Sequence, residues 1–243
     1  MTPAQPLQAP DPSPLQELRA LRQIARLPRF WTRLGHLPKG NAVVMVIPGF
    51  LTGDGVTWPL RRTLGALGHT VYGWGMGRNH GDVPALVPRV TAQVQRLADR
   101  HGPIHLIGWS LGGYLAREAA RDTPQSVAQV ITLASPIIGG PKYTAAAQYF
   151  VQEMGEDLDA IERAVAERDE VPLTTPITAI YSPIDKVVCP GACIDHVNPH
   201  TAHIAIACSH AGFGFNPDVF SIIARRLASH THSAPKNTSP HHP

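Results

Sequence analysis

The sequence predicts an α/β domain in which a mostly parallel sheet is covered by helices on both faces. The chain has 243 residues, 43% hydrophobic and 16% charged, which is enough to bury one sizeable core. Short apolar runs alternate with segments of helical periodicity along the chain. The run at 42–47, AVVMVI, is apolar at every position, as expected for a strand covered on both faces.

The order of these patterns gives the expected elements. Strands are expected at 42–47, 69–74, 104–107, 127–134, 177–181 and 202–207. Helices are expected at 56–67, from Val83 to a cap at Gly102, at 111–121, and after Asn216, which would act as the N-cap with Pro217 in the first helical position. Each strand is separated from the next by a helix or a long connection, which favours parallel pairing.

The two ends differ in composition from the body at 40–229. Residues 1–14 hold five prolines and residues 230–243 hold four histidines, so both ends are predicted to be disordered. Residues 15–39 carry six cationic side chains and one anionic side chain, a local charge of +5. Because the whole chain has a net charge of +3, the body is left at 3 − 5 = −2. We therefore expect no nucleic-acid partner for the body.

The segment at 15–39 predicts a basic amphipathic helix. Leucine or isoleucine stands at 15, 18, 21, 24 and 27, beside arginines at 19, 22 and 26, and Pro28 is expected to end the helix. Two interpretations stay open: a helix packed on the body with its arginines in water, or a peripheral membrane contact through residues 15–34. The sequence has neither a signal-peptide pattern nor a run long enough to span a membrane, which predicts a cytoplasmic protein, with the membrane contact at its periphery as the alternative.

The first chemical motif is Gly108-Trp109-Ser110-Leu111-Gly112, which fits G-x-S-x-G. The expected strand at 104–107 ends just before it and the expected helix at 111–121 begins just after it. A serine on such a tight strand-to-helix turn projects above the sheet, and only small residues fit two positions to either side. Ser110 is therefore the candidate nucleophile.

With this motif in this setting, the sequence resembles the α/β-hydrolase family over about residues 41–228. The resemblance implies the α/β-hydrolase fold, with a mostly parallel central sheet, helices on both faces and a small helical cap insertion. It also implies an acid and a histidine after the serine in the chain. Asp185, in Ser182-Pro183-Ile184-Asp185-Lys186-Val187-Val188, looks like the acid, and His210, in Ser209-His210-Ala211-Gly212, looks like the general base. The runner-up acid is Asp195, and the weaker histidines are His196, His200 and His203.

The resemblance further implies an oxyanion hole made of two backbone N–H groups. Leu111, directly after the nucleophile, would give one of them. Phe50, in the loop after the strand at 42–47, would give the other. The family usually has His-Gly before this residue, whereas this chain has Pro48-Gly49, so the anchoring of the loop is in doubt but the N–H is not removed.

The longest insertion between expected strands, at 135–176, resembles the family's small cap. It holds two expected helices, at about 144–154 and 157–168, which either cover the site or form a fixed pair on the surface. Apolar side chains near the strand ends predict a substrate with an apolar acyl group. The candidate substrate contacts are Leu51, Trp109, Ile137, Phe150 and Phe213.

The cysteines suggest neither a metal site nor a disulfide framework. No histidine stands at a metal-ligand spacing from Cys189 and Cys193, so we expect free thiols, with a disulfide between them as the alternative. Cys208 is expected to be buried.

Together these residues predict a serine hydrolase of the esterase or lipase type, which cleaves carboxylic esters through Ser110, His210 and Asp185. The reaction needs no cofactor and no metal. An acyltransferase, a thioesterase or an amidase would use the same three residues. A non-catalytic scaffold that binds lipid or protein is the alternative outside the enzymes.

Overall fold

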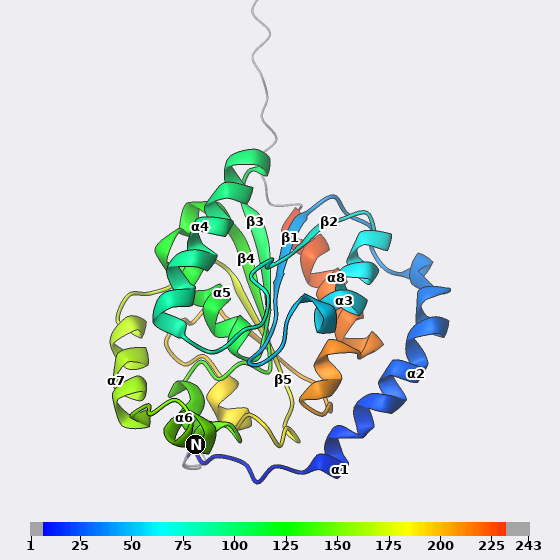
Figure 1. The fold of residues 1–243 in the computed structure, drawn as a ribbon. Helices are drawn as coiled ribbons and strands as arrows, with labels where there is room; N and C mark the ends of the chain where they lie inside the picture. Colours follow the sequence, from blue (N-terminus) through cyan, green and yellow to red (C-terminus); the bar gives the residue numbers. More distant parts are fainter. Residues whose placement is uncertain (1–6, 232–243) are drawn as a thin grey trace, which may run out of the picture.

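The computed structural model describes residues 7–231 and contains one six-stranded sheet in the order β2-β1-β3-β4-β5-β6 (Figure 1). All five neighbouring pairs are parallel. The strands are β1 (Val43–Ile47), β2 (Thr70–Gly73), β3 (Ile104–Trp109), β4 (Val127–Leu133), β5 (Ile177–Tyr181) and β6 (Ala202–Ala205). The predicted fold class and all six predicted strands are confirmed. The last strand ends two residues earlier than the sequence pattern indicated.

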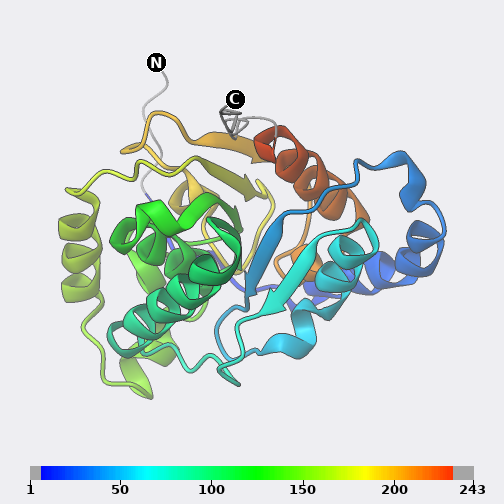
Figure 2. The ribbon, with the colours of Figure 1, turned by 90° about the horizontal axis from the view of Figure 1, so that it is seen from above.

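The helices form a layer on each face of the sheet. Figure 2 shows α4 and α5 against one face and α3 and α8 against the other, with α2 outside them. The helices are α1 (Pro14–Glu17), α2 (Arg19–Trp31), α3 (Asp54–Ala66), α4 (Val83–His101), α5 (Leu111–Asp122), α6 (Ala147–Gln152), α7 (Leu158–Asp169) and α8 (Pro217–Thr231). Five short 3-10 turns lie between them, η1 (Leu34–His36), η2 (Pro124–Ser126), η3 (Gly140–Tyr143), η4 (Pro190–Cys193) and η5 (Ala211–Gly214).

The fully apolar strand β1 shows why the core has two halves. Successive side chains of a strand point to opposite faces. Val44 and Val46 therefore pack with α3 and α8, while Met45 and Ile47 pack with α4 and α5. All four side chains are buried, as the unbroken apolar run predicted.

Two predicted helix ends are confirmed. Gly102 caps α4 with a φ of 76°, a conformation that favours glycine. The side-chain oxygen of Asn216 accepts a hydrogen bond of 2.9 Å from the backbone N–H of Asp218, in the first turn of α8.

The prediction that Pro28 ends the N-terminal helix is wrong, because α2 continues through it to Trp31. Proline lacks the N–H that would bond the carbonyl of Ile24, one turn earlier. Both residues are exposed, so water can bond that carbonyl. The preceding turn, at Leu18, also separates the short α1 from α2.

Between β4 and β5, residues 135–176 form the cap, which consists of η3, α6 and α7. Both predicted cap helices are present, and α6 is shorter than predicted. The disordered ends predicted from the sequence fall partly outside the described residues, namely at 1–6 and 232–243. Within the described part, no helix combines the length and the apolar character that crossing a bilayer requires.

Candidate active site

Ser110 lies on the sharp turn between β3 and α5 with φ 54° and ψ −125°. A non-glycine residue at positive φ is strained, and the surroundings must hold it there. The backbone N–H of Ser110 donates to the carbonyl of Leu133 at 2.7 Å. The flanking glycines leave no room for larger residues: a Cβ on Gly108 would lie 2.2 Å from the carbonyl oxygen of Gly112, and a Cβ on Gly112 would lie 2.3 Å from that of Ile47.

Asp185 and His210 form a hydrogen-bonded pair at the carboxyl edge of the same sheet. Asp185 follows β5, His210 follows β6, and His210 Nδ1 lies 2.8 Å from Asp185 Oδ2. The other carboxylate oxygen, Oδ1, accepts from the backbone N–H groups of Val187 at 2.7 Å and Val188 at 3.0 Å. The carboxylate is buried and three donors fix its orientation, so it can hold one ring orientation of His210.

Ser110 and His210 line one cavity, at the edge of the sheet where β3 and β6 end. The ring of Trp109 lies beside the imidazole, with 5.9 Å between ring centroids. Among the described residues, the Ser110 hydroxyl makes no hydrogen bond, so it is available to a partner in the cavity. Nucleophile–base contacts are often loose without a substrate and tighten when one binds.

The loop after β1 approaches the serine closely. A Cβ on Gly49 would lie 3.2 Å from the Cβ of Ser110, so a glycine lets this backbone come near. Within the described residues, the N–H groups of Phe50 and Leu111 donate to no other group. Both are therefore free to bind an oxyanion above Ser110.

Asn79 anchors this loop through three hydrogen bonds. Its buried side chain donates to the carbonyl of Pro48 at 3.0 Å. Its backbone carbonyl accepts from Leu51 at 2.7 Å, and its backbone N–H donates to Thr52 at 2.8 Å. The sequence analysis did not select Asn79, because nothing in the local pattern of the loop shows that a residue 31 positions away holds it.

Glu17 is a second residue that the sequence analysis missed. Its carboxylate accepts from the backbone N–H groups of His210 at 3.3 Å and Ala211 at 2.7 Å, and it lines the cavity. The neighbouring Gln16 donates its side-chain amide to the carbonyl of Ile184 in the acid loop. Helix α1 thus holds the loops of both His210 and Asp185. The available signal was that Glu17 is the lone acid among the cations of 15–39.

The cavity has a volume of about 720 Å³ and runs along one face of α5, from Leu111 past Tyr114 and Glu118 to Asp122. Leu111 and Asp122 are eleven helical rises apart, which corresponds to about 16 Å. The other walls of the cavity are mostly apolar and come from α4 and the cap. They include Val83, Val87, Phe150, Ile161 and Val165.

The five predicted substrate contacts divide into two groups. Trp109 and Phe150 line the cavity, and Phe50 does so as well. Leu51, Ile137 and Phe213 do not line it: Phe213 and Ile137 are buried, Phe213 in the core beside α3 and α8, and Leu51 takes a positive φ of 57° in the turn that follows Phe50. Nearness to a strand end did not distinguish side chains that face the cavity from those that face the core.

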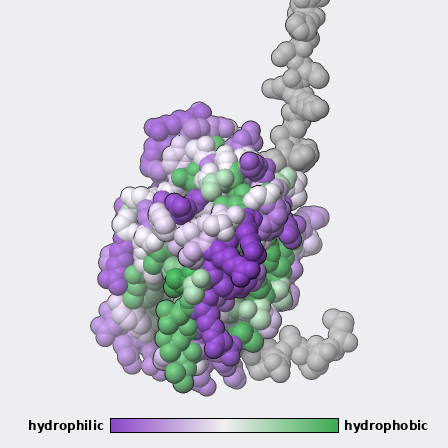
Figure 3. All heavy atoms as spheres, turned by 90° about the vertical axis from the view of Figure 1, so that its right-hand side faces the viewer, coloured by the Kyte–Doolittle hydropathy of each residue, from purple (hydrophilic) through white to green (hydrophobic). Residues whose placement is uncertain are grey.

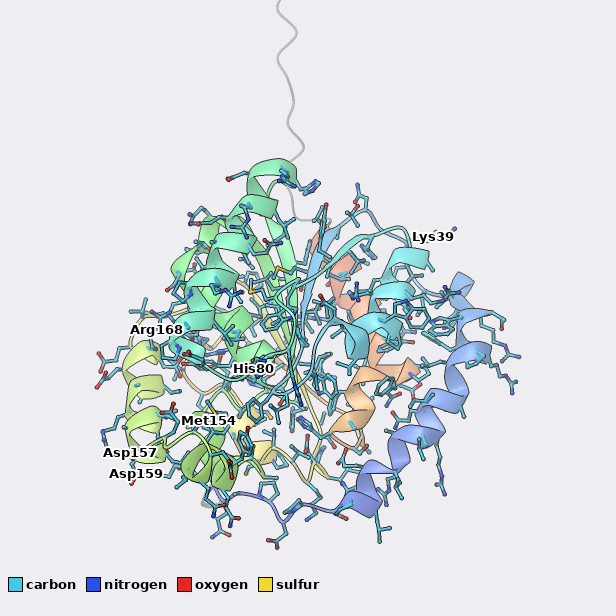
Figure 4. The ribbon with its side chains drawn as sticks, in the orientation of Figure 1. Lys39, His80, Met154, Asp157, Asp159 and Arg168 are labelled. Carbon is cyan, nitrogen blue, oxygen red and sulfur yellow. The ribbon has the colours of Figure 1, made fainter. Side chains whose placement is uncertain are left out.

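Ion pairs at the far end of the cavity join the cap to the body. Arg168, near the end of α7, pairs with Glu118 at 2.6 Å and Asp122 at 2.8 Å on α5 (Figure 4). Asp169 pairs with Arg121 at 2.6 Å. Figure 4 shows the opposite end of α7, with Asp157 and Asp159, away from these contacts. The cap helix α7 is therefore tied to α5 through ion pairs, in which Glu118 and Arg121 of α5 are buried.

The runner-up acid and the cysteines have other contacts. Asp195 pairs with the buried Arg117 and accepts from the side chain of Asn198, so it does not face His210. Burial opposes the charged form of Asp195, but the charge of Arg117 and the hydrogen bonds from Arg117 and Asn198 together lower its pKa to about 2. All three cysteines are free thiols, and burial raises the pKa of Cys208 to about 11.

A family model described as the alpha/beta hydrolase fold matches residues 76–181. This stretch runs from the loop after β2 to the end of β5 and includes Ser110. No curated protein matches the sequence significantly.

Solved structures match most of the chain at low sequence identity. A metagenome-derived lipolytic enzyme is 16% identical with a TM-score of 0.60, over 81% of this chain and 96% of its own. The monoacylglycerol lipase of Paleococcus ferrophilus is 14% identical with a TM-score of 0.58, over 79% and 97%. The thioesterase domain from the curacin biosynthetic pathway is 15% identical with a TM-score of 0.54, over 79% and 93%. At these identities the likeness establishes the fold alone.

Proposed function

We propose that this chain, which has the α/β-hydrolase fold, is a serine hydrolase that cleaves carboxylic esters with an apolar acyl group. The observation that carries the proposal is the Asp185–His210 pair, 2.8 Å apart, on the same cavity as a serine held at positive φ. An imidazole held by a buried carboxylate can act as the general base that activates a serine hydroxyl at neutral pH. The strained turn presents that hydroxyl above the edge of the sheet.

The first half of the reaction forms an acyl-enzyme. The Oγ of Ser110 attacks the carbonyl carbon of the ester while Nε2 of His210 takes the hydroxyl proton. The negative charge that develops on the carbonyl oxygen is bound by the backbone N–H groups of Phe50 and Leu111. His210 then gives its proton to the leaving alcohol, and Asp185 stabilises the imidazolium that exists between the two transfers.

The second half releases the acid. Water enters the place of the alcohol, and His210 takes one of its protons as the oxygen attacks the acyl carbon. The collapse of this second tetrahedral intermediate returns the proton to Ser110. Side chains of this chain perform every proton transfer in the scheme.

The apolar walls of the cavity support an acyl group as the part of the substrate that is bound. An extended chain lying along α5 would contact Val87, Ile161 and Val165. Each buried methylene contributes about 0.8 kcal/mol, or about fourfold in kcat/KM while the cavity can still accept it. We expect kcat/KM to rise with acyl length and then to fall once the chain reaches the ion pairs around Glu118.

The deciding experiment combines active-site labelling with a substrate panel. A fluorophosphonate should label Ser110 in the wild-type protein, with the site identified by peptide mass spectrometry. Ser110→Ala should lose both labelling and turnover of p-nitrophenyl esters while keeping its thermal transition. Undiminished turnover by Ser110→Ala would refute the assignment, and absence of both labelling and turnover in the wild type would favour a non-catalytic scaffold.

The acceptor and the leaving group need a separate comparison. Matched acyl esters, thioesters and anilides would be assayed at one acyl length, with and without an added alcohol. The ester should give the highest kcat/KM. A higher value for the thioester or the anilide, or transfer to the alcohol in place of hydrolysis, would replace the esterase with a thioesterase, an amidase or an acyltransferase at the same site.

A further inference from the structure

The outer surface of α1 and α2 bears apolar side chains that no described residue covers. Leu15, Leu18, Leu21 and Ile24 are 80%, 56%, 60% and 41% exposed. At 100° per residue, Leu18, Leu21 and Ile24 form a strip along one flank of the helix. The described part of the chain has ten large hydrophobic side chains with comparable exposure, and four of them lie in these ten residues.

The inner surface of the same helix explains why it stays on the body. Ala20 and Leu27 are buried, and the side chain of Gln23 accepts a contact of 3.6 Å from the thiol of Cys208. Glu17 holds the backbone on both sides of the loop at His210. The exposed strip is therefore not needed for docking α2 onto the sheet domain.

A row of arginines lies directly beside the apolar strip. Arg19, Arg22, Arg26 and Arg29 occupy the flank that follows it around the helix, and all four are exposed. Arg26 pairs with Asp218 at 3.0 Å, whereas Arg19 and Arg22 form no ion pair within the described residues. Figure 3 shows this side of the molecule, where a hydrophilic band runs next to hydrophobic atoms.

We propose that the exposed face of residues 15–29 is a docking surface for a bilayer that carries anionic headgroups. An apolar strip with a cationic border lies in the headgroup region with its leucines toward the acyl chains, and cations beside it gain from anionic lipid. Residues 15–39 carry a net charge of +5, whereas the body carries −2. An anionic bilayer therefore attracts this segment of the chain and not the body, which turns the segment toward the bilayer.

The docking surface adjoins the cavity, because Glu17 of α1 is one of the residues that line it. Helix α1 lies at the edge of the sheet where the strands end (Figure 1). Gln16 contacts the carbonyl of Ile184, whose side chain is 36% exposed and extends the apolar surface toward the acid loop. A bilayer bound here lies beside the cavity that an apolar substrate would enter.

The test is vesicle binding by the full-length protein, measured by flotation with phosphatidylcholine vesicles with and without 30% phosphatidylglycerol. The wild type should bind the anionic vesicles and lose affinity as salt rises. Arg19→Gln/Arg22→Gln should bind about 30-fold more weakly, because each arginine near an anionic surface contributes about fivefold. Leu18→Ser/Leu21→Ser should bind at least about tenfold more weakly.

Matched controls change the same residue types elsewhere. Arg96→Gln/Arg100→Gln on α4 and Val171→Ser/Val197→Ser should bind as the wild type does, since these exposed residues lie outside the strip. Circular dichroism, the thermal midpoint and hydrolysis of a soluble short-chain ester should be unchanged in every variant. Vesicle binding is measured without turnover, so its outcome is independent of the proposed hydrolase activity.

Two results would overturn the proposal. One is the absence of vesicle binding by the wild type, or equal binding by all the variants. The other is a wild-type dimer in light scattering that the Leu18→Ser/Leu21→Ser variant converts to a monomer, without vesicle binding. That second result would mean that the strip contacts another copy of the chain.

Discussion

Asp185→Asn tests whether the buried carboxylate sets the proton position on His210. The two oxygens of Asp185 have different partners: Oδ1 accepts from two backbone N–H groups, and Oδ2 faces His210 Nδ1 at 2.8 Å. An asparagine keeps its oxygen on the two backbone donors, so its NH₂ group takes the place of Oδ2. It then donates to Nδ1, which leaves the proton on Nε2, where it blocks acceptance of the serine proton.

The size of the loss follows from these contacts. In the blocked tautomer a loss of about 10⁴ in kcat is expected. The flipped amide would restore the tautomer but turns its NH₂ toward two N–H donors, which costs about 2–3 kcal/mol and leaves about 1–3% of molecules competent. We therefore expect kcat to fall by between about 30-fold and about 10⁴-fold. The thermal midpoint should change little because shape and volume are kept.

The assay is steady-state hydrolysis of a p-nitrophenyl ester with the concentration of folded sites fixed by circular dichroism. Asp159→Asn, which removes an exposed carboxylate from the cap, is the charge-matched control and should retain wild-type kcat. A kcat for Asp185→Asn within tenfold of the wild type would mean that the carboxylate does not set the tautomer, and the assignment of Asp185 would fail.

Three other changes probe the packing, the cavity and the charges. Gly112→Ala should lower the free energy of unfolding in urea by at least about 2 kcal/mol, because the added Cβ would lie 2.3 Å from a backbone oxygen. Gly55→Ala, which has open space around its Cβ, should not lower it. Equal urea midpoints for the two variants would contradict this reasoning. Val87→Trp should reduce kcat/KM for a long-chain ester and leave an acetyl ester within about twofold; equal losses would argue against acyl binding along α4. The folded-state pKa of Asp195 is lowered to about 2, so the charged carboxylate stabilises the fold only above that pH. The difference in unfolding free energy between wild type and Asp195→Asn should therefore be largest above about pH 4 and shrink by about 2 kcal/mol as the pH falls toward 2. A difference that urea titrations find independent of pH would refute this prediction.

The strands could be predicted from the sequence because each carries its own signal. An apolar run such as 42–47 needs cover on both faces wherever it lies in the sheet, and its length limits it to a strand. The helix ends at Gly102 and Asn216 were predictable for the same reason, since each cap depends on one residue and its immediate neighbours. The prediction that Pro28 ends the helix was wrong because the cost of the missing N–H depends on whether water can reach the unpaired carbonyl. That exposure is set by tertiary structure and not by the local sequence.

The candidate site was predictable only where a motif stands in a recognisable place. Ser110, Asp185 and His210 each follow a strand, and the structure puts all three at one edge of the sheet. Asn79 and Glu17 contact the backbone of the site from 31 and 193 positions away, and a single sequence has no local pattern for such pairs. Three of the five predicted substrate contacts do not line the cavity, because side-chain direction after a strand end depends on the turn, as Phe50 and Leu51 show.

The contacts of α1 constrain how the N-terminus can be shortened. A deletion that starts the chain after Glu17 would leave the backbone N–H groups at His210 and Ala211 without their acceptor, and would free the carbonyl of Ile184 from Gln16. Such a truncated chain would keep Ser110, His210 and Asp185 but lose the contacts through which α1 joins the loop of His210 to the loop of Asp185. Lower turnover after that truncation would therefore combine the loss of these loop contacts with any loss of lipid contact. Point substitutions on the outer face of the helix are needed to separate the two effects.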